Sequence, residues 1–469
     1  MDSAKLIKRC MEALSNIPDR EQKRALMMDF LLAWYLFQNF RQTYAAICAD
    51  GVDPESPQEY ALQQTVFIPV PLRWDKADHP TEVLSNFLFH IEELVPELQG
   101  TVQPELWTGH VTDQELQDLI QLYGNWSLVH TLTGDNCAEL LEWILWETPL
   151  EGREQRFFTP PQVAELLADM LQPKVGTVYD PCCGTGSLLT AVAEHMTGQQ
   201  VFRQLYGHEY NEQMWRISKL LCYLRRFPAD LGPKPTYALT TWPADLPKVD
   251  FVIANPPYND ERWKRVKETA KTDPRWRYGT PLKTGADMAW LQHMLYTLKD
   301  DGSMAVIMSI SSLSKVNERD IRRMIVEDGL VEAVLLLPAR IFYSTPVPTS
   351  VWVLRKGRER EADMLLMDAR KLGTQQGKQI ILEGPACQKI LETYQAFQRG
   401  ERPEDEGFCV CPPRRRISEE NWELDPKRYI RYPQEPLPDW SELARLDESL
   451  TRELEELLLK NGKLLQKIC

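Results

Sequence analysis

From Gly176 onward, short β-branched or apolar runs alternate with helical stretches, and this alternation restricts the possible fold more than any other feature. The expected strands are GTVYD, QLYGHE, TYALT, DFVIAN, SMAVIMS, LVEAVLLL, TSVWVL and ADMLLMD. The helical patterns between them are SLLTAVAEHM, NEQMWRISKLLCYLRR, GADMAWLQHMLYTL and NERDIRRMIVED. The alternation predicts an α/β fold, a doubly wound, mostly parallel sheet with helices on both faces. Ligands of such sheets bind outside the carboxyl ends of the strands.

The rest of the chain divides around this sheet. Residues 1–150 carry apolar side chains at helical spacing and no strand pattern, which predicts an all-α N-terminal domain. The sheet domain is expected over residues 151–370, and residues 371–469 are expected to form a C-terminal helical tail that binds a partner. In that tail, leucines recur at seven-residue intervals from Leu443 to Leu464, which fits either a coiled coil or a helix docked on its own domain.

Charge and composition limit the function classes. The 469 residues carry a formal net charge of −14, which argues against nonspecific coating of nucleic acid, so any polyanion must be contacted locally. The longest apolar run near the start, MMDFLLAWYLFQNF, is too short to span a bilayer, and no signal peptide opens the sequence. We therefore expect a cytoplasmic protein without membrane contact. The cysteines form no C-x-x-C pair, so no metal site is expected.

The stretch VYDPCCGTGSLL follows the first expected strand and opens a helix. Asp180 ends the strand, Gly184 and Gly186 lack a Cβ that would block a close ligand, and Ser187 is expected to cap the helix. The spacing serves nucleotide phosphates poorly, but an acidic Asp180 suits a cationic group. Glu209, at the end of the second strand, can accept both hydroxyls of a ribose. An adenosyl group with a cationic amino-acid part describes S-adenosylmethionine. A tight strand-to-helix turn without ligand is the alternative.

The stretch DFVIANPPYND forms the carboxyl end of the fourth expected strand. Asn255 stands at its tip, and the fixed φ angles of Pro256 and Pro257 make the following turn rigid. The Asn255 side-chain oxygen and the Pro256 carbonyl could hold the two N–H groups of a planar amine and expose its lone pair to a sulfonium methyl group. Tyr258 could stack on a base swung out of a duplex. A strand-ending Pro-Pro turn without catalytic role is the alternative.

In their order, these motifs resemble the modification subunit of type I restriction-modification systems, the N6-adenine DNA methyltransferase family. The resemblance covers about residues 120–432 and includes RFFTPPQVAELLADML, VYDPCCGTGSLL, YGHEYNEQMWRISKLLCYL, DFVIANPPY, GADMAWLQHMLYTL and LVEAVLLLPARIFYSTPVPTSVWVLRK. It implies a Rossmann-like, S-adenosylmethionine-dependent methyltransferase that modifies a flipped-out adenine in double-stranded DNA.

The resemblance also assigns roles to residues. It implies that Phe158, Thr159 and Pro160 line the methionine end of the cofactor, that Asp180, Cys182, Gly184 and Gly186 form its loop, that Glu209 holds the ribose, and that Asn255, Pro256, Pro257 and Tyr258 take the adenine. Thr159 also fits a local role as cap of a helix begun by Pro160. One departure concerns the acidic residue that the family places after the third strand, for which Thr240, Thr241 and Asp245 are weak candidates.

Sequence recognition is expected to lie on other chains. The sheet is expected to close near Lys356 without a target-recognition domain, and the resemblance implies a separate specificity subunit and a restriction subunit. The stretch 261–283 mixes Lys and Arg with Trp263, Trp276 and Tyr278, which suits phosphates and a displaced base, or else a solvated loop. Alternatives to the DNA enzyme are a protein-glutamine or RNA-adenine methyltransferase, since N-P-P-Y also holds other planar nitrogens, and a catalytically silent scaffold.

Overall fold

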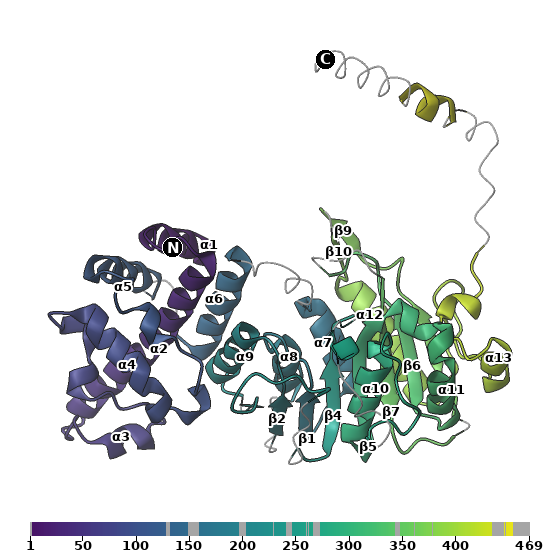
Figure 1. The fold of residues 1–469 in the computed structure, drawn as a ribbon, viewed down its shortest axis with the longest axis horizontal. Coiled ribbons are helices and arrows are strands. Elements are labelled where there is room, and N and C mark those ends of the chain that lie inside the picture. The colour runs from purple at the N-terminus through teal and green to yellow at the C-terminus, as the bar shows by residue number, and fades with distance from the viewer. Residues whose placement is uncertain are drawn as a thin grey trace.

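A helical region lies beside a large α/β sheet in the computed structural model (Figure 1). The structure describes residues 2–127, 132–148, 159–196, 203–227, 229–240, 246–258, 260, 262–265, 273–342, 348–360, 362–377, 379–433, 445 and 447–453. Most of the leucine repeat predicted near the C-terminus lies outside these residues. Within them, no helix combines the length and the apolar character needed to cross a membrane.

Nine strands form one sheet in the order β11-β8-β6-β7-β5-β4-β1-β2-β3. The strands are β1 (Gly176–Asp180), β2 (Arg203–Gly207), β3 (Ala229–Asp230), β4 (Val249–Ala254), β5 (Leu298–Ser309), β6 (Val331–Leu336), β7 (Thr349–Arg355), β8 (Leu365–Asp368) and β11 (Cys409–Val410). β7 runs antiparallel to β5 and β6, β11 runs antiparallel to β8, and the other neighbours are parallel. The predicted mostly parallel, doubly wound sheet is confirmed.

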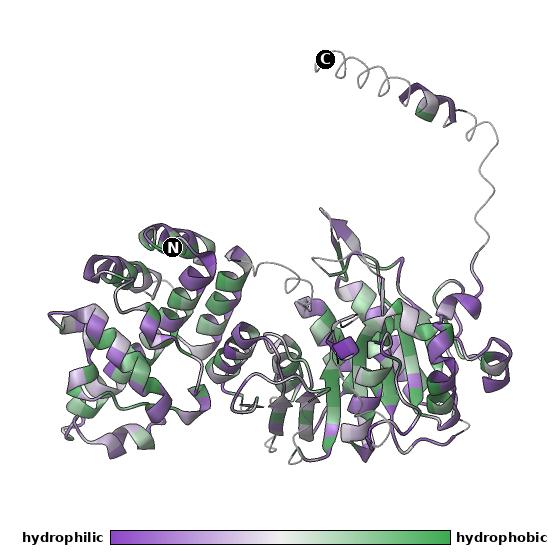
Figure 2. Ribbon diagram, in the orientation of Figure 1, coloured by the Kyte–Doolittle hydropathy of each residue, from purple (hydrophilic) through white to green (hydrophobic). Residues whose placement is uncertain are grey.

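The sheet is buried on both faces because alternate side chains of its strands enter two cores. In β5, Ala305 and Ile307 face one core, while Met304 and Val306 face the other. The first core is covered by α7 (Pro161–Leu171), α8 (Ser187–His195) and α12 (Gly384–Gln398), and the second by α10 (Ala286–Thr297) and α11 (Arg319–Glu327). The central strands are accordingly hydrophobic along their length (Figure 2). This two-sided burial explains why the strands read as continuous apolar runs.

The N-terminal helices have a core of their own. They are α1 (Ser3–Ala13), α2 (Arg20–Ala49), α3 (Pro57–Leu62), α4 (Pro80–Leu94), α5 (Asp113–Ser127) and α6 (Gly134–Glu147). Short 3-10 helices between them span Val70–Leu72, Trp74–Lys76, Pro96–Leu98 and Pro104–Leu106. Those later in the chain span Trp263–Arg265, Ile310–Leu313, Val316–Glu318 and Pro426–Arg428. Helix α9 (Glu212–Leu224), which follows β2, adds Ile217, Leu221 and Leu224 to this N-terminal core, whereas its Trp215 packs with the sheet. One helix therefore serves both parts of the molecule.

The prediction of a third strand at TYALT is wrong. The third strand is the short β3, and residues 236–240 form a loop and turn that pairs with no strand. The carbonyl oxygens of Ala238 and Leu239 accept hydrogen bonds from the Arg275 guanidinium instead, at 3.2 and 3.0 Å. The β-branched and aromatic composition of the stretch fitted a strand. Its backbone carbonyls, however, accept hydrogen bonds from an arginine distant in the sequence and not from a neighbouring strand.

Part of the segment beyond Lys356 packs against the sheet. β8 and β11 extend the sheet edge, β9 (Thr374–Gln376) and β10 (Gln379–Ile381) form a separate hairpin, and α13 (Arg414–Glu419) follows β11. Tyr394 of α12 lies in one core, and Ile417 and Leu424 lie in the other. The sheet therefore does not close near Lys356, because these later residues supply both an edge and a cover for it.

Candidate active site

The loop after β1 is built by its own backbone and by the end of β2. Asp180 Oδ1 accepts the backbone N–H of Cys182 at 3.0 Å, and the N–H of Gly186 bonds the carbonyl of Cys183 at 2.8 Å. Gly184 and Gly186 have φ angles of +56° and +87°, and a Cβ on Gly186 would come within 2.6 Å of the Ser218 hydroxyl. The glycines predicted to shape this loop therefore do so. Ser187 does not cap α8, because Gly186 is its N-cap and makes no side-chain bond.

Asp180 presents a buried carboxylate oxygen that lacks a partner. The residue is 1% exposed, and no hydrogen bond reaches its Oδ2 among the described residues. Burial, opposed by the bonds from Cys182 and reinforced by the nearby Glu209, raises the pKa of Asp180 to about 8. A cation beside this oxygen would both supply the missing contact and favour the ionised form. The loop therefore fits the cationic group of S-adenosylmethionine.

Glu209 is held in place directly opposite this loop. Its Oε2 accepts the N–H of Gly184 at 2.9 Å, and its Oε1 accepts the N–H of Asn211 at 2.7 Å. Burial raises the pKa of Glu209, while the backbone donors and Arg262 oppose the shift. A carboxylate offers about four acceptor sites, so the backbone donors leave part of its capacity for a ligand hydroxyl. The two fixed oxygens suit a ribose diol.

Two tyrosines and an arginine form the wall next to Glu209. The guanidinium of Arg262 lies 4.4 Å from the ring centroid of Tyr210 and 5.1 Å from that of Tyr237. Asp260 Oδ1 pairs with Arg262 Nε at 2.9 Å, and its Oδ2 accepts the Tyr237 hydroxyl at 2.9 Å. The sequence reasoning missed this aromatic wall, although Tyr210 directly follows Glu209 and was a detectable signal. Of the weak candidates for an acidic contact here, Thr240 bonds the carbonyl of Tyr237 at 3.1 Å, and Thr241 and Asp245 lie outside the described residues.

Asn255 stands at the end of β4 with both ends of its amide engaged. Its Nδ2 donates to Thr159 Oγ1 at 3.1 Å, and its Oδ1 accepts the Tyr258 hydroxyl at 2.8 Å. Asn255 and Thr159 are 6% and 5% exposed. Burial raises the pKa of Tyr258 well above its usual value, and the nearby Asp287 adds to the shift, so its hydroxyl stays protonated and donates. The predicted cap at Thr159 is wrong, because α7 has Pro160 as N-cap and no side-chain capping bond.

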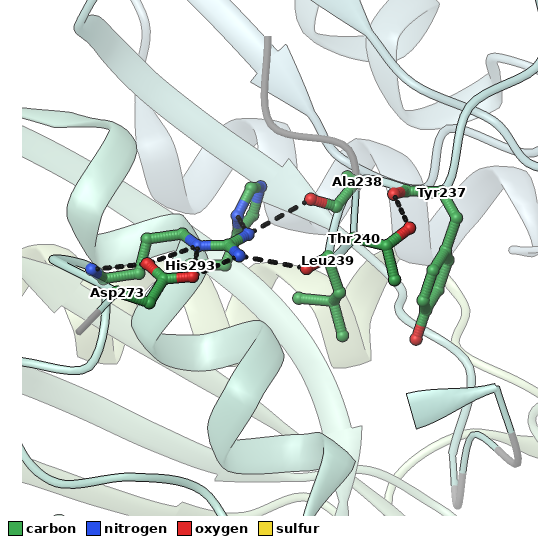
Figure 3. A network of polar contacts seen from close by, with 7 residues as sticks. Tyr237, Ala238, Leu239, Thr240, Asp273 and His293 are labelled. Atoms are coloured by element: carbon green, nitrogen blue, oxygen red, sulfur yellow. Dashed lines mark hydrogen bonds and ion pairs between the residues drawn. The ribbon is translucent and has the colours of Figure 1, made fainter. Parts of the chain in front are cut away.

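A buried polar network holds the residues that directly follow Tyr237. Arg275 pairs with Asp273 at 2.6 Å and donates to the carbonyls of Ala238 and Leu239. Its Nη1 lies 3.1 Å from His293 Nδ1, and these contacts are drawn in Figure 3. Burial and the Arg275 charge lower the pKa of His293 far below its usual value, so the imidazole is neutral. The network fixes the segment that carries Tyr237.

The interpretation of stretch 261–283 as an exposed, base-stacking surface is wrong for its aromatic residues. Trp263, Trp276 and Tyr278 are 4%, 8% and 7% exposed and belong to the core against α10. Arg275 is buried as well, whereas Lys264 and Arg277 are exposed and could meet phosphate. Composition alone could not separate these cases, because a buried arginine network and a basic surface loop use the same residue types.

One cavity joins most of the predicted site residues. Thr159, Asp180, Cys182, Gly184, Glu209, Asn255 and Pro257 line it, together with Tyr210, Thr236, Tyr237, Arg262 and Trp290. Pro160, Pro256, Gly186 and Tyr258 do not line it, and Phe158 lies outside the described residues. The cavity thus extends from the Asp180 loop and Glu209 to the Asn255 amide. A donor bound at one end would face an acceptor at the other.

Comparisons with known proteins agree with this arrangement. The family model described as N-6 DNA Methylase matches residues 133–436. The chain is 30% identical to the methylase subunit of the type I restriction enzyme HindI from Haemophilus influenzae, over 88% of this chain and 97% of that one. It is 26% identical to the MjaIX methylase subunit from Methanocaldococcus jannaschii, over 86% and 76% of the two chains.

A solved structure of the same kind of subunit has a similar fold. A type I restriction-modification system methyltransferase subunit from Streptococcus thermophilus superposes with a TM-score of 0.69 and 21% identity, covering 91% of this chain and 99% of the other. The family match spans more than half of the sequence and includes the whole cavity described above. The chain therefore belongs to the N-6 DNA methylase family, among the modification subunits of type I restriction-modification systems.

Proposed function

We propose that this chain is a site-specific adenine-N6 DNA methyltransferase that takes its methyl group from S-adenosylmethionine. The observation that carries the proposal is one cavity lined both by Asp180, whose Oδ2 has no hydrogen-bond partner among the described residues, and by Asn255. A carboxylate suited to a cation, a second carboxylate suited to a diol and an amide oxygen that now bonds the Tyr258 hydroxyl together fit methyl transfer from a sulfonium to a planar amine.

The residues of the cavity divide the work. Asp180 holds the cationic amino-acid part of the donor, and Glu209 holds its ribose. Tyr210 and Tyr237 offer aromatic surface for the adenine ring of the donor. When bound, S-adenosylmethionine supplies an electrophilic methyl group on sulfur. The buried thiol of Cys183, whose pKa burial raises well above the usual value, is no nucleophile, so direct transfer to the acceptor suits the site better than a covalent enzyme intermediate.

On the acceptor side, Asn255 Oδ1 and the Pro256 carbonyl accept the two N–H groups of the target amine. This draws the nitrogen toward a pyramidal geometry and exposes its lone pair. Tyr258 leaves its bond with Asn255 and stacks on the adenine, which must be extruded from the duplex to reach the cavity. The energetic cost of extrusion is a few kcal/mol and is offset by stacking and by these hydrogen bonds.

The choice of adenine is assigned to partner chains. We propose that a separate specificity subunit recognises the DNA sequence, that the segment 371–469 binds partners, and that a restriction subunit can join the assembly. Support comes from the family and from the core packing of the described residues after Lys356, which complete the sheet and form no separate recognition domain. Exposed Lys264 and Arg277 could contact phosphates near the site.

The test uses Asn255→Ala in the full-length chain with its native partners. Methyl label from S-adenosylmethionine should enter DNA with the wild type and not with the variant, and modification-sensitive long-read sequencing should locate N6-methyladenine at one motif. Cofactor affinity should stay within about threefold, because the variant loses an amine acceptor and keeps Asp180 and Glu209. Asn317→Ala, at an exposed position, is the matched control and should methylate normally.

Other outcomes identify the alternatives. Label in protein or RNA would indicate a glutamine or RNA-adenine methyltransferase. Absence of measurable cofactor binding to the complete assembly would indicate a scaffold that keeps only the fold. Undiminished methylation by Asn255→Ala would contradict the role given to the amide.

A further inference from the structure

Two rigid corners from distant parts of the chain meet at one hydrogen bond. One corner is Thr159-Pro160-Pro161 at the start of α7, and the other is Asn255-Pro256-Pro257 at the end of β4. The bond between them, from Asn255 Nδ2 to Thr159 Oγ1, joins residues that are 96 positions apart and is 3.1 Å long. Each partner is followed by two residues of fixed φ, so neither backbone can shift freely.

The packing below this bond makes it more rigid. The carbonyl of Pro160 accepts the backbone N–H groups of Val163 and Ala164, at 2.9 and 3.0 Å, which fixes the first turn of α7. Val163 and Leu167 are fully buried in the same core as Ile253 of β4. Thr159 and Asn255 are thus mounted on two elements that share a core, and their hydroxyl and amide have little room to separate.

This bond engages the nitrogen end of the Asn255 amide, with the Thr159 hydroxyl as acceptor. A carboxamide has a donor end and an acceptor end, which a rotation about χ2 exchanges. Because Thr159 engages the nitrogen, the oxygen points to Tyr258, whose hydroxyl now bonds it at 2.8 Å. An incoming amine must take the place of that hydroxyl. Once Tyr258 has left, Thr159 is the contact that keeps the oxygen aimed.

The geometry points to Thr159 as a positioning residue for methyl transfer, which acts by holding the Asn255 amide with its oxygen toward the target amine. The inference rests on the proposed function and deepens it. It differs from a capping role, since α7 has no side-chain cap, and from the cofactor contact that family resemblance implies, since the bond goes to the amide that receives the acceptor.

The experiment compares Thr159→Val, which keeps the shape and removes the hydroxyl, with Thr159→Ser, which keeps the hydroxyl. Methyl transfer in a single turnover is measured with the native assembly and saturating cofactor, and the affinity for S-adenosylhomocysteine is measured by calorimetry. The valine variant should transfer methyl about tenfold or more slowly, as expected for a lost hydrogen bond at a buried amide, while affinity changes by less than about threefold. Serine should restore most of the rate.

Controls separate this role from a loss of folding or of cofactor. Thr43→Val removes another threonine hydroxyl of a buried residue, in α2, which bonds Thr65, and should leave both the rate and the affinity unchanged. A Thr159→Val variant with wild-type rate, or one that loses affinity in proportion to its rate, would overturn the inference. So would a serine variant as slow as valine.

Failure of the inference and failure of the proposed function give different results. If Asn255→Ala is inactive and Thr159→Val is fully active, only the positioning role is wrong. If Asn255→Ala itself methylates DNA normally, the function assigned to this corner is wrong, whatever Thr159 does.

Discussion

Replacing Asp180 with asparagine should stabilise the cofactor-free chain while weakening its cofactor binding. Asparagine is isosteric, and its oxygen can still accept the N–H of Cys182. The other carboxylate oxygen, which has no partner among the described residues, becomes an uncharged amide nitrogen. The substitution therefore removes the cost of neutralising a carboxyl on burial without removing the turn that follows β1.

The magnitude follows from the pKa of the Asp180 carboxyl. Folding raises this pKa from 3.8 to about 8, so the folded state binds a proton more tightly, and stability is lost as pH rises through this window. At pH 7 the solution is about 3 pH units above the unfolded pKa of 3.8, whereas the folded carboxyl is still protonated. Taking up that proton on folding costs about 1.4 kcal/mol per pH unit, or roughly 4 kcal/mol. Asparagine avoids this cost. At pH 5 the same arithmetic leaves less than about 2 kcal/mol.

The assay follows thermal unfolding of both proteins between pH 5 and pH 8. Because a chain of this size does not unfold in one step, the readout is the midpoint of the transition that ligand shifts. The midpoint of Asp180→Asn should exceed that of the wild type by an amount that grows with pH. Asp29→Asn is the matched control, since burial raises the pKa of Asp29 to about 7 in the N-terminal helices, away from the cofactor cavity.

Cofactor binding supplies the second readout. A cation favours ionised Asp180, so calorimetry in two buffers should detect proton release on binding near pH 7, and wild-type affinity should rise toward pH 8. Asp180→Asn should bind more weakly and lose this pH dependence, whereas Asp29→Asn should bind like the wild type. Equal affinity of Asp180→Asn and wild type at pH 8, or a lower midpoint for the variant across the whole range, would refute the reasoning.

Two further substitutions test other parts of the cavity. Glu209→Ala should weaken S-adenosylhomocysteine binding about ten- to a hundredfold in calorimetry, because it removes charged hydrogen bonds to the ribose and leaves the N–H groups of Gly184 and Asn211 unpaired; a change below twofold would contradict the ribose role. Arg275→Met should lower the midpoint of the thermal transition that ligand shifts, because it leaves Asp273 without its cation, a loss of about 3–5 kcal/mol for a buried pair. It should also reduce cofactor affinity through the Tyr237 segment; an unchanged midpoint would contradict the network.

The sequence could predict the parts of this molecule that depend on local pattern. Continuous apolar runs marked the strands because both sheet faces are buried, and the glycines after Asp180 and the prolines after Asn255 marked the two strand ends that meet at the cavity. Parallel strands bring their carboxyl ends to one edge, so the alternation of strands and helices was enough to place motifs far apart in the sequence at the same edge.

The remaining features depend on long-range contacts that no local pattern carries. Arg275 reaches the carbonyls of Ala238 and Leu239, 37 and 36 residues away, and so turns a strand-like sequence into a fixed loop. The bond from Asn255 to Thr159 spans 96 residues, and each end alone looked like an ordinary proline corner. Short edge strands such as β11 consist of too few residues to leave a periodic signal.

Helix α9 has a practical consequence for handling this protein. It begins at Glu212, three residues after Glu209, with Asn211 as its N-cap, and packs Ile217, Leu221 and Leu224 into the core of the N-terminal helices. A cut made near residue 150 to isolate the α/β part would uncover that apolar face and expose to water the helix that follows Glu209. The smallest portable methyltransferase from this chain therefore includes the helices that precede the sheet.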